Sequence, residues 1–144
     1  MPRHTFRYTE IPISAGGPFP RGQVVYRPYM LALVQGSKGN SIRCIVWPDS
    51  GADHCVFPLT FALALGLDPL KMETQLTGGV GSVANVTCYD MVEIDVGVEA
   101  PFTTLAGFTA GLEAQGIGLL GQAGFFENFQ VTFDLKTRAF HLDA

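Results

Sequence analysis

The sequence has no long hydrophobic run and no cluster of basic residues. No apolar segment is long enough to span a membrane. Residues 1–21 are polar and rich in proline and glycine, without the apolar stretch of a secretory signal peptide. The formal net charge is -4, and the Lys and Arg residues are scattered, which argues against a nucleic-acid partner. We therefore expect a cytoplasmic protein that contacts neither membrane nor nucleic acid.

Cysteine and histidine are scarce. Cys44, Cys55 and Cys88 are an odd number without metal-ligand spacing, and each lies in an apolar context, which predicts buried, reduced thiols and no metal site. The histidines are scattered, so no Ser/Cys–His triad has a spacing signature. His54 adjoins Cys55, but neighbours in a strand point to opposite faces, which disfavours a His–Cys dyad.

Charged residues are also few, at 15% of a chain that is 47% hydrophobic. So little charge to cover the surface indicates a large buried interface between chains. Short apolar runs are separated by many of the 17 Gly and 9 Pro, a pattern typical of an all-β fold rich in turns. A length of 144 residues suits one domain with a single core.

The rest of the chain is organised around residues 45–53. An apolar, β-branched run ends at Asp49, and Ser50 and Gly51 then favour a tight turn. This places the Asp49 carboxylate at the end of a buried strand, on a turn of small residues that a second backbone can approach closely. The alternative is an Asp that merely opens a turn after a strand.

Other segments have clear local signals. Residues 1–22 contain several prolines and glycines and are predicted to be an arm, able to add an edge strand to a partner subunit. Pro58 and Gly66 predict the start and stop of a helix over residues 59–65. Apolar runs predict strands over residues 29–34, 41–47, 55–57, 102–108, 117–121, 129–134 and 139–142.

A glycine-rich loop, Thr77–Ser82, lies between two β-prone runs at residues 73–76 and 83–96. Together they predict a hairpin. A phosphate-binding loop would need a helix directly after the glycines and a suitably placed Lys, and the sequence has neither. We interpret the hairpin as a flap that closes over a bound chain and excludes water, with an ordinary surface hairpin as the alternative.

The order of these pieces resembles the retropepsin family of aspartic proteases. The resemblance consists of a strand ending in Asp-Ser-Gly-Ala at residues 49–52, the Gly-rich hairpin, and Ile-Gly-Leu-Leu-Gly at residues 117–121 before a short helical segment. It covers roughly residues 27–142. It implies an all-β fold, a small closed β-barrel with one or two short helices and a flap hairpin, spanning residues 23–144 after an N-terminal arm at 1–22.

The same resemblance implies an aspartic endopeptidase that hydrolyses polypeptides without a cofactor or metal. One Asp-Ser-Gly motif per chain implies a C2 homodimer, in which the two Asp49 carboxylates meet and activate a water. Ser50 and Gly51 would form the active-site turn and the dimer contact, and Gly51 would also bind the substrate backbone. The implied substrate-binding residues are Ala52, Asp53, Gly78, Gly79, Val80 and Gly81.

Two residues depart from the family pattern. Pro48 replaces a residue with a free N–H, so the strand is expected to bulge or to end one residue early. Gln122 stands where retroviral members often carry an Arg that pairs with the Asp corresponding to Asp53, which must then find another donor or remain solvated. These departures leave the alternative of a catalytically weak retropepsin-like fold that serves as a dimerisation or peptide-binding module.

Overall fold

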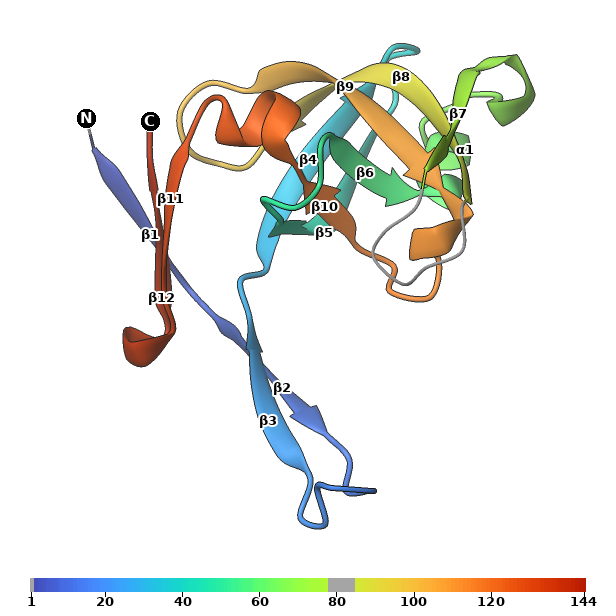
Figure 1. Ribbon diagram of the computed structural model, residues 1–144. Helices are drawn as coiled ribbons and strands as arrows, with labels where there is room; N and C mark the ends of the chain where they lie inside the picture. The colour runs from blue at the N-terminus through green and yellow to red at the C-terminus, as the bar shows by residue number, and fades with distance from the viewer. Residues whose placement is uncertain (1, 78–84) are drawn as a thin grey trace.

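The computed structural model describes residues 2–77 and 85–144. Within this part of the chain, six strands close into a barrel, because β4 pairs with β5 on one side and with β8 on the other. The all-β class and the closed barrel expected from the sequence are confirmed. In order around the barrel (Figure 1) the strands are β4 (Met30–Gly36), β5 (Ser41–Pro48), β10 (Gly118–Leu120), β6 (Cys55–Pro58), β9 (Phe102–Thr109) and β8 (Asn85–Asp95).

Alternating side chains along the strands build the core. In β4, Met30, Ala32 and Val34 are buried while the residues between them are exposed, as a period of two requires. Helical segments add to the core from outside the barrel. The largest fully buried side chains include Phe57, Phe108, Phe125, Phe140, Leu65 and Ile94.

The short strand β10 occupies the position on which the candidate site depends. It lies between β5, to which it is parallel, and β6, to which it is antiparallel (Figure 1). A methyl group at Gly121, the residue after β10, would lie 2.2 Å from the carbonyl oxygen of His54 and 2.7 Å from that of Ala52. Only glycine therefore allows the chain after β10 to pack closely on the backbone of the segment that follows β5.

Short helices pack against the strands of the barrel. α1 (Leu59–Ala64) begins after Pro58, and Gly66 beyond its end adopts a left-handed conformation, as the sequence predicts. Glu113 binds its first turn, because the backbone N–H and the hydroxyl of Thr60 donate to the Glu113 carboxylate at 2.7 and 3.0 Å. No helix in residues 2–77 and 85–144 is long and apolar enough to cross a membrane.

Further single turns are η1 (Pro69–Lys71), η2 (Ala110–Leu112) and η4 (Leu135–Thr137). The segment after β10 forms the π-type turn η3 (Gln122–Phe126), with non-helical backbone angles at two of its residues. It occupies the place where the sequence predicts a short helical segment.

The predicted hairpin is present on both sides of its tip. β7 (Glu73–Thr77) pairs antiparallel with the first half of β8, while the second half of β8 closes the barrel against β4. The Thr77 and Thr87 hydroxyls are hydrogen-bonded to each other where the two strands meet. Residues 78–84, which include most of the predicted flap loop, lie outside the described residues, so its role as a flap stays a prediction.

A separate sheet joins the two ends of the chain. β1 (Arg3–Arg7) pairs antiparallel with β12 (Ala139–Asp143), which pairs antiparallel with β11 (Gln130–Asp134). Phe140 of β12 is fully buried and stacks on Phe6 of β1, with ring centroids 5.3 Å apart. The aromatic contact places apolar area between the two terminal strands.

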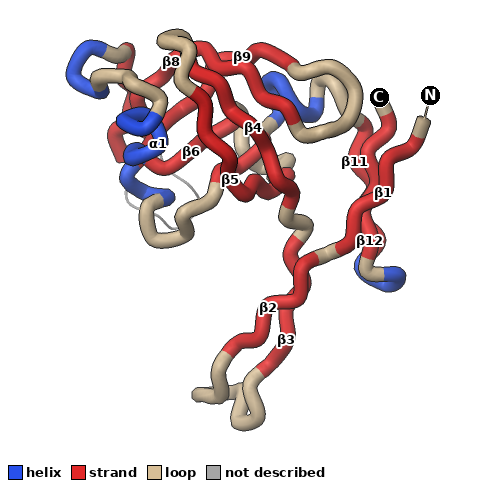
Figure 2. Tube along the Cα trace, turned by 180° about the vertical axis from the view of Figure 1, so that it is seen from behind, coloured by secondary structure: helices blue, strands red, loops and turns tan. Residues whose placement is uncertain are grey.

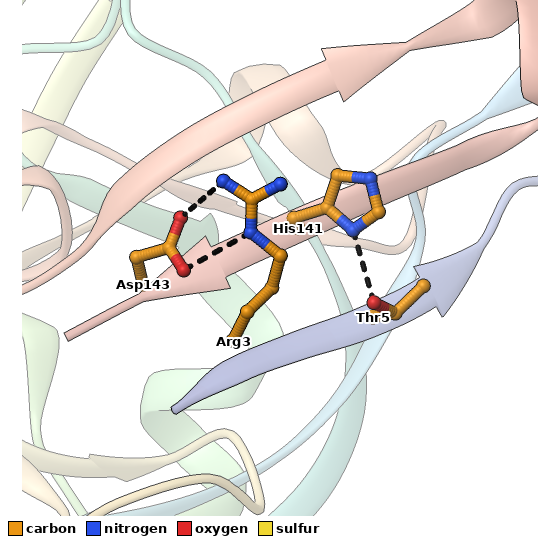
Figure 3. Close-up of polar contacts among 4 residues, drawn as sticks. All are labelled: Arg3, Thr5, His141 and Asp143. Atoms are coloured by element: carbon orange, nitrogen blue, oxygen red, sulfur yellow. Dashed lines mark hydrogen bonds and ion pairs between the residues drawn. The ribbon is translucent and has the colours of Figure 1, made fainter. Parts of the chain in front are cut away.

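Polar contacts on the surface of this sheet also connect β1 with β12 (Figure 3). Arg3 donates from Nε and Nη2 to the Asp143 carboxylate at 3.2 and 3.0 Å, and the Thr5 hydroxyl lies 3.0 Å from His141 Nδ1. The hydrogen bond from Arg3 lowers the pKa of Asp143. Because solvent reaches this ion pair, we attribute the stability of the sheet mainly to its aromatic packing.

The remaining strands, β2 (Thr9–Ile13) and β3 (Gln23–Arg27), pair with each other and with no other described strand. Their hairpin projects away from the barrel in both views (Figures 1 and 2). The predicted arm at residues 1–22 thus contains β1 and β2. Pro12 is tolerated in β2 because that strand has a partner on one side only. Addition of a strand from this arm to a partner subunit stays a prediction.

We expect Gly121→Ala to unfold at a temperature several degrees below the parent, because the added methyl would collide with two backbone carbonyls. The matched control is Gly16→Ala, since a methyl at Gly16 meets no atom within 4 Å. Thermal unfolding followed by circular dichroism measures both. Equal melting temperatures for the two variants would contradict the close approach of β10.

The thiols should be inert in the folded protein. Cys44, Cys55 and Cys88 are buried and free, as the sequence predicts, and burial raises the pKa of Cys44 and of Cys55 to about 11. At pH 8 both are almost wholly protonated, and the thiol is the unreactive form. We expect iodoacetamide to modify them at least about a hundredfold faster in denaturant than in native buffer, as measured by mass spectrometry. Similar rates in both conditions would contradict their burial.

Candidate active site

Asp49 follows β5 directly and continues its pairing with β10. Its backbone N–H donates to the carbonyl of Leu120 at 2.8 Å, which extends the parallel ladder by one residue. The residue is half-buried. The carboxylate is therefore carried by backbone that is anchored on a neighbouring strand.

Pro48 does not disturb this arrangement. N–H groups of successive residues in a strand point to opposite sides. Since the N–H of Asp49 points toward β10, the nitrogen of Pro48 faces the β4 side, where pairing ends at Met30 opposite Val46. No ladder hydrogen bond is lost, and β5 runs through Pro48, which pairs with Leu120. The expectation of a bulge or an early end was wrong for this reason.

The turn after β5 holds one oxygen of the Asp49 carboxylate. The backbone N–H of Gly51 donates to Asp49 Oδ1 at 2.9 Å, and the N–H of Ala52 donates to the Asp49 carbonyl at 3.1 Å. Oδ2 accepts no hydrogen bond from residues 2–77 or 85–144, so it is the oxygen left for another molecule. Asp49 thus does open an Asx turn after the strand, which is the alternative role that the sequence suggests for it, and this turn orients the carboxylate.

The start of η3 supports the other end of the turn. The backbone N–H groups of Gln122 and Ala123 donate to the carbonyls of Ala52 and Asp53 at 2.8 and 2.9 Å. The side chain of Gln122 adds a hydrogen bond from Nε2 to the Ser50 carbonyl at 2.8 Å. Gln122 therefore supports the turn, although it cannot form the ion pair with Asp53 that an Arg would form.

An open cleft of about 650 Å³ lies over this turn. Asp49, Gly51, Ala52 and Asp53, which the sequence singles out, all line it, whereas exposed Ser50 is not among the lining residues. Gly78, Gly79, Val80 and Gly81 lie outside the described residues. The cleft is also lined by Thr77, the first residue of the predicted flap loop. Further lining residues were not assigned to the site by sequence reasoning, namely His54, Val56, Gln75, Leu76, Asn85, Thr87, Tyr89, Thr109, Gly111, Leu112 and Leu119.

Strand alternation could have revealed part of this missed set. Leu119 and Val56 lie opposite each other on β10 and β6, each next to fully buried neighbours, so they face the side of the sheet away from the core. Thr87 and Thr109 lie opposite each other on β8 and β9. The pairing of β8 with β9 that brings the two threonines beside the turn cannot be predicted from the residues around either one.

A polar group borders the cleft at the end of the turn. The rings of His54 and Tyr89 pack edge to face, with centroids 5.8 Å apart. Burial raises the pKa of Tyr89, and the negative charge of Asp53 raises it further. The phenol consequently remains a hydrogen-bond donor at neutral pH. Asp53 is exposed, and its carboxylate accepts no hydrogen bond from the described residues. Of the two outcomes expected for it, another donor or a solvated carboxylate, the described residues thus supply no donor.

Cys55 is not among the residues that line the cleft, whereas its neighbour His54 is. Cys55 is fully buried, and its Sγ lies 3.7 Å from the Ala123 carbonyl, to which the thiol donates. His54 packs on Tyr89 on the cleft side. In the part of the chain that the structure describes, no group of three or more His, Cys, Asp or Glu side chains is placed to bind a metal ion.

Comparison with known proteins supports the fold. No family model and no curated protein matches the chain. Among solved structures, the crystal structure of a retropepsin-like aspartic protease from Rickettsia conorii is similar over 93% of this chain and 98% of that chain, with 22% sequence identity and a TM-score of 0.55. At this identity, the likeness establishes that the chain has the retropepsin-like fold.

Proposed function

We propose that the protein is an aspartic endopeptidase that hydrolyses peptide bonds as a homodimer. The observation that carries the proposal is the Asp49 carboxylate, which lines the cleft with Oδ1 bound by the turn and Oδ2 available. A rigid, half-buried carboxylate in an open cleft is what general acid–base chemistry on a bound chain requires. The fold shared with a retropepsin-like aspartic protease supports the same conclusion.

The mechanism needs a second carboxylate, which we infer comes from the Asp49 of a second copy. Two carboxylates at close range share one proton, because both cannot be ionised. The ionised member takes a proton from water, and the water oxygen attacks the scissile carbonyl carbon, whose oxygen is polarised by the protonated member. Proton transfer to the nitrogen then releases the amine product. The titration belongs to the pair and not to either residue.

The substrate in this proposal is an extended polypeptide. Gly51 and Ala52 line the cleft beside Asp49, and the Gly51 carbonyl, which accepts no hydrogen bond from the described residues, can accept one from the substrate backbone. The predicted flap residues Gly78, Gly79, Val80 and Gly81 would cover the bound chain. Apolar side chains on the cleft wall suit apolar substrate side chains next to the scissile bond. They are Val56, Leu76, Leu112 and Leu119.

The alternative function, a dimerisation or peptide-binding module without efficient hydrolysis, depends on the two departures at Pro48 and Gln122. Pro48 removes no ladder hydrogen bond, and Gln122 binds the turn. The hydrogen bonds that hold Asp49 and Ser50 are made in spite of both departures, which supports the enzyme over the module.

Activity should depend on the Asp49 carboxyl. Asp49→Asn keeps the size and hydrogen-bonding capacity of the side chain but cannot share a proton, so we expect peptide cleavage to fall by roughly a thousandfold or more. The measurement is cleavage of a mixed peptide library between acidic and neutral pH, with and without a peptidomimetic aspartic-protease inhibitor.

The matched control for this experiment is Asp68→Asn. Asp68 accepts a hydrogen bond from the Leu70 N–H at 3.0 Å as the N-cap of η1, a role that Asn fills equally well. We expect it to retain parental activity. Cleavage by Asp49→Asn at the rate of the control would show that the catalytic assignment is wrong.

Dimerisation should depend on Ser50, which is exposed on the turn. We expect sedimentation at micromolar concentration to detect a species of about twice the 15.5 kDa chain mass. The Ser50→Ala dimer should dissociate at higher protein concentration than the parent. Each lost hydrogen bond weakens the dimer by about 0.5–1.5 kcal/mol, and the two-fold symmetry means that two such bonds are lost. A parent that stays monomeric at every concentration would exclude the proposed mechanism.

A further inference from the structure

The Ser50–Gly51 peptide group is hydrogen-bonded at both of its ends. Its carbonyl oxygen accepts from Gln122 Nε2 at 2.8 Å. Its N–H donates to Asp49 Oδ1 at 2.9 Å. One peptide plane therefore connects a side chain that follows β10 with the carboxylate that follows β5, across 72 residues of sequence.

The direction of this chain of hydrogen bonds is fixed by chemistry. A backbone carbonyl can only accept, so the amide of Gln122 must present its NH₂ group. A hydrogen bond to the carbonyl of a peptide polarises that peptide and strengthens donation from its N–H. The two bonds therefore reinforce each other, and both hold the same Asp49 oxygen in place.

Gln122 also contacts the turn through its backbone. Its own N–H donates to the Ala52 carbonyl at 2.8 Å, two residues beyond the carbonyl that its side chain binds. Hydrogen bonds from within the chain thus reach the carbonyls of Asp49, Ser50, Ala52 and Asp53. In the described residues, the Ser50 carbonyl is the one of these four that is bound by a side chain.

We propose that Gln122 is a positioning residue for Asp49, acting through the Ser50–Gly51 peptide group. The geometric part of this proposal concerns the turn alone. Its catalytic consequence rests on the proposed peptidase function. A neutral amide suits the position, because it donates to the carbonyl without placing a further charge beside Asp49 and Asp53.

Two substitutions separate positioning from bulk packing. Gln122→Leu keeps most of the volume and removes the donor at every pH. Gln122→Glu carries a carboxyl that donates to the Ser50 carbonyl when protonated and repels it when ionised. The change is expected at or above the ordinary Glu pKa of about 4.3, because the carboxylates of Asp49 and Asp53 disfavour the ionised form. The control is Gln23→Leu, the same change at an exposed residue of β3 in the projecting hairpin.

The readout that needs no activity is hydrogen exchange of the Gly51 amide, measured by NMR as a ratio to the parent at the same pH. We expect Gln122→Leu to exchange about two- to tenfold faster than the parent at all pH values, as loss of one hydrogen bond predicts. Gln122→Glu should match the parent near pH 3.5 and approach the Leu variant at pH 7. Gln23→Leu should match the parent throughout.

The exchange rates of the Gln122 variants are compared at several pH values, so the other titratable groups around the turn must be considered. They are Asp49 and Asp53 on the turn, His54 and Tyr89 at the end of the cleft, and Glu127 after η3, which accepts from the Gly124 N–H. All five are present in every variant and in the parent. The ratio of exchange rates therefore cancels the pH dependence that these groups have in the parent, and it reports the group introduced at position 122 together with its effect on them.

Peptide cleavage supplies the second readout. We expect kcat of Gln122→Leu to fall about two- to tenfold with KM nearly unchanged, and kcat of Gln122→Glu to recover toward acidic pH. Unchanged Gly51 exchange in Gln122→Leu would overturn the proposal, as would a Gln122→Glu variant that follows Gln122→Leu at all pH values. If the parent cleaves no peptide, the peptidase function fails, while Gly51 exchange still decides whether Gln122 holds the turn.

Discussion

The insertion of β10 between β5 and β6 is the constraint on which the rest of the site depends. β10 pairs in parallel with β5, and this pairing places the Leu120 carbonyl where the Asp49 N–H can reach it. Gly121 then allows the chain to pass against the carbonyls of Ala52 and His54. This close contact brings Gln122 and Ala123 within hydrogen-bonding distance of the turn. A bulkier chain at this crossing would separate the turn from its supports.

The sequence predicted the features that depend on local chemistry. Alternation and turn residues placed most strands, the helix after Pro58 and the turn at Ser50 and Gly51, because each is decided within a few residues. It also singled out Asp49, which is among the residues that line the cleft. The effect of Pro48 was misjudged, because it depends on which side of β5 a neighbouring strand still pairs.

Features that depend on distant pairing were not predictable from local patterns. The pairing of β1 with β12 joins residues near the two ends of the chain, and nothing in residues 3–7 identifies residues 139–143 as their partner. The hydrogen bond from Gln122 to the Ser50 carbonyl has the same origin. The family pattern, with an Arg at position 122, suggests only that an ion pair with Asp53 is missing. The side chain of Gln122 instead binds the backbone carbonyl of Ser50, which carries no charge.

The wide sequence separation within the site also affects how it forms during synthesis. A chain made from its N-terminus has residues 49–53 long before residues 118–123, which hold them in place. Until the later segment emerges, Asp49 lies on a turn without its main supports. For the proposed peptidase, this order delays the appearance of an organised site until most of the barrel can form. If the chain is a peptidase, this delay would spare the nascent chain and its neighbours from cleavage while they are still unfolded.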